Sequence, residues 1–237
     1  MALVPMVPGL VVRPVENPVD RLAARRLHAQ CYLDNGYVEP SDLTASGLLD
    51  DDWVPFSEYF VAIDEESDEV VGTCRLIRPS VRGFPCFQHF DPSPDAMEIF
   101  QDIDPNRCAE ISALATRRNG MQNLAISGAL YGAVWRRAIE DERAYLFAIV
   151  DDRLKRLAKT FLEIPIEPIA EPLQFMGART TPMAVYVPRA VSEIQPENMA
   201  FFSGDIPFSE LNEMALDLRR EVPEFTPNVI DLEAAKA

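Results

Sequence analysis

One short segment of this 237-residue chain places residues that could do chemistry next to one another. Residues 108–122 read as a buried strand with one acid, Glu110, then a basic turn that contains Gly120, then the start of a long helix. The amides of such a turn and the positive end of the helix dipole favour an anion. The same amides can polarise a carbonyl group. The segment therefore suits the phosphorylated arm and the thioester of an acyl donor.

Composition restricts the class of protein. Hydrophobic residues make up 48% of the chain and charged residues 25%, as in globular proteins with a sizeable core. The longest apolar run, residues 124–135, is too short to span a bilayer, which needs about twenty residues, so we expect no integral membrane segment. The N-terminus lacks the positive start of a signal peptide, and the four cysteines show no CxxC spacing. These features predict a cytoplasmic protein with reduced thiols.

Charge and histidine content restrict the partners and the kinds of site that the protein can have. The net charge of −16 argues against nucleic acid as a partner. Residues 117–159 nevertheless contain nine basic and five acidic side chains, which predicts a docking surface for an acidic partner. Exposed faces of two helices are the alternative. The two histidines, His28 and His89, lie far apart without metal-ligand spacing, so we predict no metal site.

Hydrophobic periodicity predicts the order β-α-loop-β-β-loop-β-α-β-α-β-β, which describes an α/β (α+β) chain with a mixed central sheet flanked by helices. Residues 79–107 are predicted as a long proline-containing loop that forms a lid or a wall of a binding site. Acids outnumber bases by ten to three after residue 189, so we divide the chain into a domain of residues 1–189 and an acidic C-terminal extension of residues 190–237. The predicted elements are strands at 10–15, 58–64, 70–77, 109–116, 144–150, 164–170 and 184–187, and helices at 18–32, 122–142, 151–162 and 208–221.

This order is that of the GNAT acyltransferase fold, and residues 18–188 resemble one branch of it. The branch contains the autoinducer synthases, which are N-acyl-homoserine lactone synthases, and the related N-acyl amino acid synthases. The resemblance rests on residues 31–37 (CYLDNGY), the acids near Asp51, the strand VGTCRLI at residues 71–77, and E-x-S at residues 110–112. It implies a GNAT fold and the formation of an amide from an acyl thioester.

Two positions depart from the family pattern. Ala113 stands where the family often has an arginine. The first helix of the family usually carries an arginine four residues before an aromatic, and here Leu27 and Cys31 fill that register. Both changes fall on groups that help to form the substrate site, so they argue against homoserine-lactone chemistry.

Amide formation needs a deprotonated amine, a polarised carbonyl group and an oriented donor arm. Glu110 is the candidate base because it interrupts an apolar strand, although an acid paired with an arginine is the alternative. Arg75 either clamps a substrate carboxylate or neutralises Glu110. From the family pattern, Asp51 is expected to line the amine pocket, although acid runs are usually solvated loops. Ser112 either assists the leaving thiolate or the tetrahedral oxygen, or bonds a neighbouring carbonyl.

The carbonyl group needs donors as well. Backbone N–H groups of Leu114, Ala115 and Thr116 would form an oxyanion hole if the strand bulges there. This expectation depends on a local distortion of the strand.

The donor arm is expected at the turn after the strand. Arg117-x-x-Gly120-x-Gln122 resembles the GNAT acyl-carrier loop R-x-x-G-x-G/A, with glutamine at the last position, and Arg118 belongs to the same basic turn. The glycine lets backbone amides approach a phosphate. The changed last position, the basic segment and the resemblance favour acyl carrier protein over coenzyme A as the donor.

The sequence therefore predicts a cytoplasmic N-acyltransferase with no bound cofactor. It would move a fatty acyl group from the phosphopantetheine of acyl carrier protein to the amine of an amino acid or a similar small molecule. Direct attack on the thioester is expected, because no histidine is placed to activate a cysteine. An N-acyl-homoserine lactone synthase and a GNAT domain that binds acyl carrier protein without turnover are the alternatives.

Overall fold

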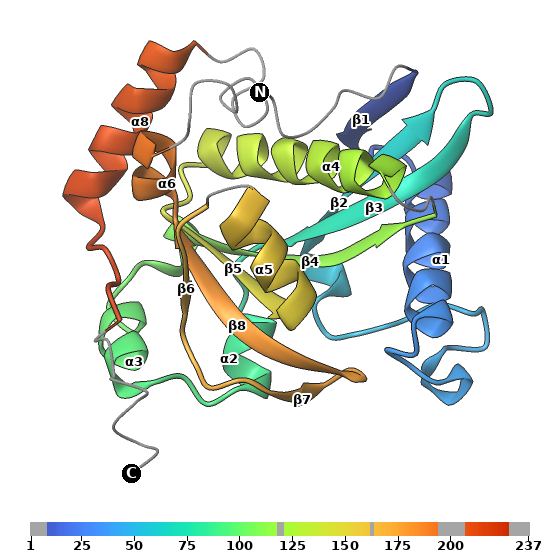
Figure 1. The fold of residues 1–237 in the computed structure, drawn as a ribbon, viewed down its shortest axis with the longest axis horizontal. Helices are drawn as coiled ribbons and strands as arrows, with labels where there is room; N and C mark the ends of the chain where they lie inside the picture. Colours follow the sequence, from blue (N-terminus) through green and yellow to red (C-terminus); the bar gives the residue numbers. More distant parts are fainter. Residues whose placement is uncertain (1–8, 118–120, 162–163, 194–206, 228–237) are drawn as a thin grey trace.

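The computed structural model describes residues 9–117, 121–161, 164–193 and 207–227. Within them, eight strands form one mixed sheet in the order β1-β2-β3-β4-β5-β8-β6, and β7 pairs with β8 (Figure 1). The β4–β5 pair is parallel, and the other pairs are antiparallel. The strands are β1 (Leu10–Pro14), β2 (Ser57–Asp64), β3 (Glu69–Ile77), β4 (Cys108–Thr116), β5 (Tyr145–Asp151), β6 (Ile166–Pro168), β7 (Leu173–Phe175) and β8 (Ala178–Tyr186).

Helices cover both faces of this sheet. Successive side chains of a strand point to opposite faces, and in β2 Phe60 and Ala62 pack in the cluster that contains α4, whereas Tyr59 and Val61 pack against Ala24 of α1. The α4 face also holds α5 and α6, and the opposite face holds α2 and α3. The helices are α1 (Pro18–Asp34), α2 (Pro85–His89), α3 (Pro94–Phe100), α4 (Met121–Glu140), α5 (Asp152–Phe161), α6 (Val187–Glu193) and α8 (Phe208–Glu221).

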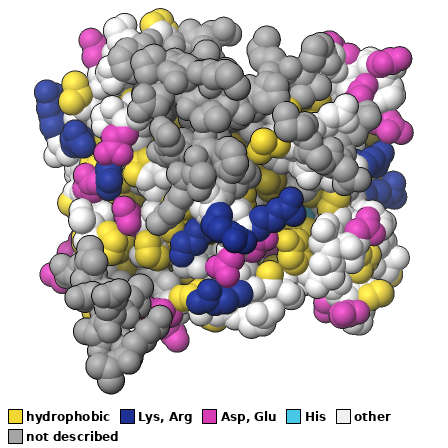
Figure 2. All heavy atoms as spheres, in the orientation of Figure 1, with side chains coloured by type: hydrophobic (Ala, Val, Ile, Leu, Met, Phe, Trp, Pro, Cys, Tyr) yellow, Lys and Arg dark blue, Asp and Glu magenta, His cyan; other side chains and the backbone are white. Residues whose placement is uncertain are grey.

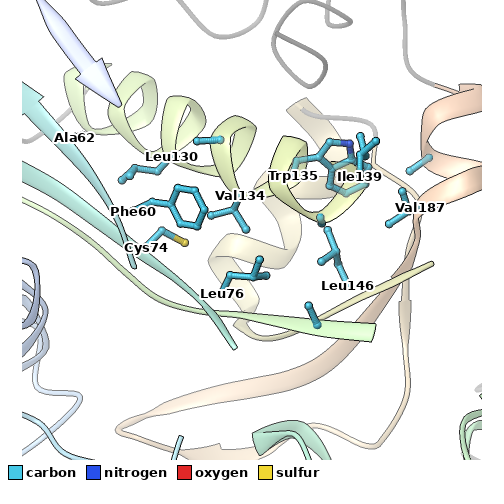
Figure 3. Packing of buried hydrophobic residues seen from close by; sticks show 14 of the residues in the cluster. Phe60, Ala62, Cys74, Leu76, Leu130, Val134, Trp135, Ile139, Leu146 and Val187 are labelled. Carbon is cyan, nitrogen blue, oxygen red and sulfur yellow. The ribbon is translucent and has the colours of Figure 1, made fainter. Parts of the chain in front are cut away.

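The core on the α4 face joins the two halves of the sheet. Figure 3 shows Phe60 and Leu76 from the N-terminal strands next to Leu130 and Val134 of α4, and Leu146 from β5 next to the Ile139 end of the same helix. All six side chains are at most 2% exposed. Burying a large apolar side chain contributes roughly 1.5–3 kcal/mol, so this cluster holds the strands on both sides of β4 in place.

The core on the opposite face includes part of the C-terminal extension. The hydroxyl group of Tyr145 donates a hydrogen bond to the carbonyl of Pro223 (2.6 Å) and accepts one from the N–H of Phe225 (2.6 Å). Tyr186 donates to the carbonyl of Val222 (2.7 Å), and Phe225 is 2% exposed. The described end of the chain therefore packs against β5 and β8, while the division at residue 189 stays a prediction.

The predicted α/β architecture with a mixed sheet is confirmed, and the helix expected at 208–221 is α8. The expectation of a loop at 79–107 is wrong, because the segment contains α2 and α3. Ser93 caps α3 by accepting the N–H of Ala96, and a proline opens each helix. The last long strand, expected at 184–187, begins at Ala178 directly after the turn at Gly177.

The turn between β7 and β8 lies against the turn that follows α1. Gly177 has φ of +73°, and a Cβ atom built on it would clash with the carbonyl oxygen of Gly36 and lie 3.2 Å from the Cα of Tyr37. Only a glycine allows this close approach of two backbones. The contact joins two segments that are distant in the sequence.

Gly177→Ala should therefore destabilise the protein more than Gly47→Ala. Gly47 has nearly the same φ, +74°, but no atom lies within 4 Å of its Cβ position. We expect about 1 kcal/mol for Gly47→Ala from the backbone conformation and a further 1–3 kcal/mol, roughly, for Gly177→Ala from the clash. Urea denaturation of both variants measures the difference, and equal losses would contradict the contact.

Candidate active site

The sheet opens between β4 and β5. These strands pair as far as Ile111 and Ala148, and the described residues show no pairing between them beyond this point. On the other side of β4, the register with β3 shifts between Thr73 and Arg75, and Ala113 has φ of +52°. A left-handed alanine beside a register shift marks a bulge, which bends the strand away from its neighbour. The bulge on which the oxyanion hole depends is therefore present.

A cavity of about 440 Å³ occupies this opening, within the range of small-molecule sites. Leu114 of β4 lines it, whereas Ala115 and Thr116 do not belong to its wall. Among the three residues expected to supply the oxyanion hole, Leu114 is the one that the structure brings to the cavity. The polar and charged residues of the wall are His28, Tyr32, Tyr37, Asp50, Asp51, Arg75, His89, Ser112, Tyr131, Asp151 and Thr180.

Three of the predicted site residues meet at this wall. Arg75 is directly opposite Ser112 in the β3–β4 pair, and its Nη2 donates to Ser112 Oγ (3.0 Å). The Nη1 atom donates to Asp51 Oδ2 (2.8 Å), which forms an ion pair with a guanidinium that is 5% exposed. Burial lowers the pKa of Arg75, but Asp51 and Tyr59 outweigh burial and raise it above its ordinary value. Arg75 is thus a fixed cation, and its carboxylate partner is Asp51.

Glu110 lies on the same strand as Ser112 but is not part of the cavity wall. Its side chain is 1% exposed and accepts a hydrogen bond from the N–H of Cys86 in α2 (3.0 Å). Pro85, the residue before Cys86, does line the cavity. Glu110 is therefore held at the base of α2, one residue away from the wall. An ion pair between Arg75 and Glu110 is not found among the described residues.

The environment of Glu110 gives it an unusual acidity. Burial raises the pKa of Glu110 to about 7, although the backbone and side chain of Cys86 and the charge of Arg75 lower it. A carboxyl group with a pKa near neutrality can both accept and release a proton at physiological pH. This is the property that a general base needs.

Sequence reasoning missed a pair of residues on α1. His28 and Tyr32, four residues apart, line the cavity, and their rings meet edge to face at 4.2 Å. The residues expected in this register, Leu27 and Cys31, instead line a separate polar hollow with Arg117. The register was therefore wrong by one residue. The apolar periodicity of α1 could not reveal this, because a histidine and a tyrosine turn to the cavity.

His28 is an uncharged polar group in this wall. It is 8% exposed, and burial, followed by the charge of Arg75, lowers its pKa to about 3. Its Nε2 atom is buried without a hydrogen-bond partner among the described residues. An unpaired buried nitrogen costs free energy.

A second missed pair joins two distant segments. Asp151, the last residue of β5, accepts hydrogen bonds from the hydroxyl of Tyr37 (3.1 Å) and from the N–H of Leu154 in α5 (2.6 Å). Both Asp151 and Tyr37 line the cavity. In the sequence, Asp151 was the first residue of a helix expected at 151–162, and Tyr37 belonged to the family-like segment 31–37. Neither pattern indicated that the two residues meet.

The residues predicted to hold the donor arm lie at the start of α4. Arg117 is half-exposed and pairs with Glu69 (3.1 Å), and Thr116 donates to Asn123 Oδ1 (2.5 Å). Gln122 is exposed on the first turn of α4. The predicted residues Arg118 and Gly120 lie outside the described residues. The structure therefore does not test the loop as a whole.

The cysteines are poorly suited to covalent catalysis. All four cysteines are free, and burial raises the pKa of Cys74 and Cys108 to about 12, which makes them poor nucleophiles. Across the described ranges, no group of three or more His, Cys, Asp or Glu side chains could hold a metal ion. Within the same ranges, no helix is both long and apolar enough to cross a membrane.

Comparison with solved structures identifies the fold. FeeM, an N-acyl amino acid synthase from uncultured soil microbes, superimposes with a TM-score of 0.59 at 20% identity over 81% of this chain and 99% of its own. The CoA-dependent acyl-homoserine lactone synthase BjaI, solved with SAM and isopentyl-CoA, gives 0.57 at 19% identity over 96% and 99%. The AHL synthase LasI gives 0.59 at 12% identity over 84% and 96%. The fold is therefore the GNAT-like fold of these acyltransferases.

A family model makes the assignment more specific. The model described as N-acyl amino acid synthase FeeM matches residues 23–186, and a search of curated proteins returns no significant match. The chain belongs to the FeeM N-acyl amino acid synthase family. It is accordingly an acyltransferase that forms an amide bond by acyl transfer to an amine.

Glu110→Gln should change the pH dependence of stability. The folded protein keeps a proton on Glu110 up to about pH 7, whereas the unfolded chain releases it near the ordinary value of 4.5. The free energy of unfolding of the wild type therefore contains a contribution that is complete below about pH 4.5 and is lost as the pH rises through about 7. Glutamine cannot titrate, so the stability of the variant relative to the wild type should increase by up to about 3 kcal/mol between about pH 5 and 8.

Urea denaturation across this pH range measures the relative stability. His28 also changes its protonation on unfolding, but both proteins contain it, so its contribution cancels in the difference. A difference that does not vary with pH would show that the carboxyl group of Glu110 has an ordinary pKa.

Proposed function

We propose that this enzyme transfers a fatty acyl group from acyl carrier protein to the amine of an amino acid. The observation that carries the proposal is the Arg75–Asp51–Ser112 group on the wall of a cavity between diverging strands, in a member of the N-acyl amino acid synthase family. An amino acid offers an amine for the reaction and a carboxylate that a fixed guanidinium can orient. On the wall, Asp51 suits the amine of the substrate and Arg75 suits its carboxylate.

The reaction proceeds by direct attack in this proposal. The amine, after loss of a proton from its ammonium form, attacks the thioester carbon, and the N–H of Leu114 stabilises the developing oxyanion. The C–S bond then breaks, the nitrogen loses a second proton, and the phosphopantetheine sulfur leaves as a thiolate that takes up one proton. The products are the amide, the free thiol and one released proton. The high pKa values of the buried cysteines disfavour an acyl-enzyme.

Glu110 is the proton acceptor in the proposal. Its pKa of about 7 suits a base that works near neutral pH. Because Glu110 does not line the cavity, the proton reaches it through a bridging water or after a movement of α2. Asp51, which lines the wall, holds the ammonium group before the transfer.

The choice of donor rests on the charge of α5. Arg153 and Arg156 are exposed on this helix, and Figure 2 shows Lys and Arg side chains gathered near the region that α5 occupies in Figure 1. Acyl carrier proteins are acidic, so complementary charge favours their docking here. The helix begins directly after Asp151 on the cavity wall, which supports delivery of the donor arm into the opening.

An N-acyl-homoserine lactone synthase is the second candidate function. The structural likeness to BjaI and LasI supports it, and BjaI is described as CoA-dependent and was solved with SAM. The family match favours amino acid acylation. Mass spectrometry of the products separates the two functions, because a lactone and an acyl amino acid differ in mass.

Glu110→Gln should lower the rate of acyl transfer roughly 10²–10⁴-fold, the usual contribution of base assistance. The measurement is mass spectrometry of N-acyl products formed by the purified enzyme from acyl carrier protein thioesters and a panel of amino acids. Glu58→Gln is the control, because Glu58 lies on β2, pairs with Arg137 and does not line the cavity. Full activity of Glu110→Gln would remove Glu110 from the proposed mechanism, and a wild type that acylates no amino acid would refute the function.

Arg153→Glu combined with Arg156→Glu should raise the KM for acyl carrier protein at least about tenfold, with little change in kcat, because docking is electrostatic. The KM for the same acyl group on free pantetheine should not change. Arg220→Glu is the control, since this arginine is exposed on α8. If coenzyme A thioesters are the better donors and the double variant leaves every KM unchanged, acyl carrier protein is the wrong donor.

A further inference from the structure

Asp151 places a carboxylate at the opening of the sheet. It ends β5 beyond the last pair that joins this strand to β4, and it lines the cavity. Two hydrogen bonds, from the hydroxyl of Tyr37 and the N–H of Leu154, fix its orientation. The hydrogen bond from Leu154 caps α5, and this cap is one reason for an aspartate at position 151. The cap needs an acceptor oxygen, however, and does not need a charge.

The charges of the cavity wall are not balanced. Its charged residues are Asp50, Asp51 and Asp151 against Arg75 alone. Asp51 pairs with Arg75, and Asp50 pairs with Arg25 from outside the wall. For Asp151, the described residues supply no ion pair. The cavity therefore keeps an excess of negative charge where a ligand would sit, and a cation on that ligand would compensate it.

A different part of the same wall suits an anion. Arg75 is a fixed cation that lines the cavity, and His28 lines it as a neutral imidazole. A carboxylate beside Arg75 gains a charge-assisted hydrogen bond, and the neutral His28 adds no charge to this part of the wall.

We propose that the acceptor is an amino acid with a positively charged side chain, whose side-chain cation binds Asp151 and whose carboxylate binds Arg75. The inference rests on the proposed function and specifies its substrate class. The α-amine is then the group that attacks the thioester, while the side-chain ammonium keeps its proton and its ion pair. The product is an Nα-acyl derivative that retains the side-chain charge.

Ornithine and norleucine test this directly. They are nearly isosteric, but the side chain of ornithine ends in an ammonium group and that of norleucine in a methyl group. With acyl carrier protein thioester as donor, we expect the wild type to prefer ornithine by roughly 10–100-fold in kcat/KM, the ratio that a charge-assisted hydrogen bond supplies. Fragmentation of the product in the mass spectrometer should place the acyl group on the α-nitrogen.

Asp151→Asn isolates the charge. Asparagine keeps an oxygen that can accept from the N–H of Leu154 and cap α5, and its amide nitrogen can donate to the Tyr37 hydroxyl, so the fold should be retained. The preference for ornithine should fall to within a few-fold of unity, because kcat/KM for ornithine falls toward that for norleucine. Asp152→Asn is the matched control, because the neighbouring Asp152 pairs with Arg179 and does not line the cavity. This control should keep the full preference.

Each contrary outcome has a separate meaning. A wild type that acylates norleucine as well as ornithine, or that acylates the side-chain nitrogen, overturns this inference and leaves the proposed function intact. A preference that survives in Asp151→Asn also overturns it. Failure to acylate any amino acid overturns both. The comparison of the two acceptors in the wild type needs no variant, so misfolding of Asp151→Asn would not prevent the test.

Discussion

The bulge at Ala113 is the local feature on which the site depends. In a regular sheet, β4 and β5 would pair along their full length, and each backbone amide between them would already have a partner. The left-handed conformation of Ala113 follows the last of these pairs, at Ile111, and β4 and β5 separate there around the cavity. The cost of the strained backbone is offset by the apolar core on both sides of the strand. Stability elsewhere therefore maintains an opening in the middle of the sheet.

The protein places ionisable groups in and beside this opening and limits their cost in three different ways. Arg75 keeps its charge because Asp51 and Ser112 occupy the two ends of its guanidinium. His28 avoids a charge by remaining neutral, and Glu110 is poised between its two forms. An unpaired buried charge costs several kcal/mol. Each of the three residues avoids this cost, either through a partner or through a shifted pKa. The three solutions leave the wall with a cation and a neutral imidazole, and they place a carboxyl group with a pKa near 7 behind the wall.

Local pattern predicted most of the fold, whereas the site required tertiary information. Alternating and continuous apolar runs located the strands up to β5, and Arg75, Ser112 and Asp51 do meet. The helices α2 and α3 were missed although Ser93 and two prolines mark their starts, because so few residues follow each signal. The bond from Tyr37 to Asp151 joins residues 114 positions apart, and no local pattern encodes such a pair. The face of α1 that meets the cavity was misassigned for the same reason, because the strands that pack against the helix determine which face lines the cavity.

The two ends of β5 have different roles, and the hydroxyl of Tyr145 serves the first of them. β5 begins at this tyrosine, which holds Pro223 and Phe225 near the chain terminus, and it ends at the cavity. A chain shortened before residue 222 would uncover the rings of Tyr145, Tyr186 and Phe100 together, and such an aromatic patch promotes self-association. Protein engineers who wish to trim the acidic extension should therefore keep its segment through Phe225. The extension is acidic in composition, but Val222 and Phe225 in its last described segment are buried in the hydrophobic core.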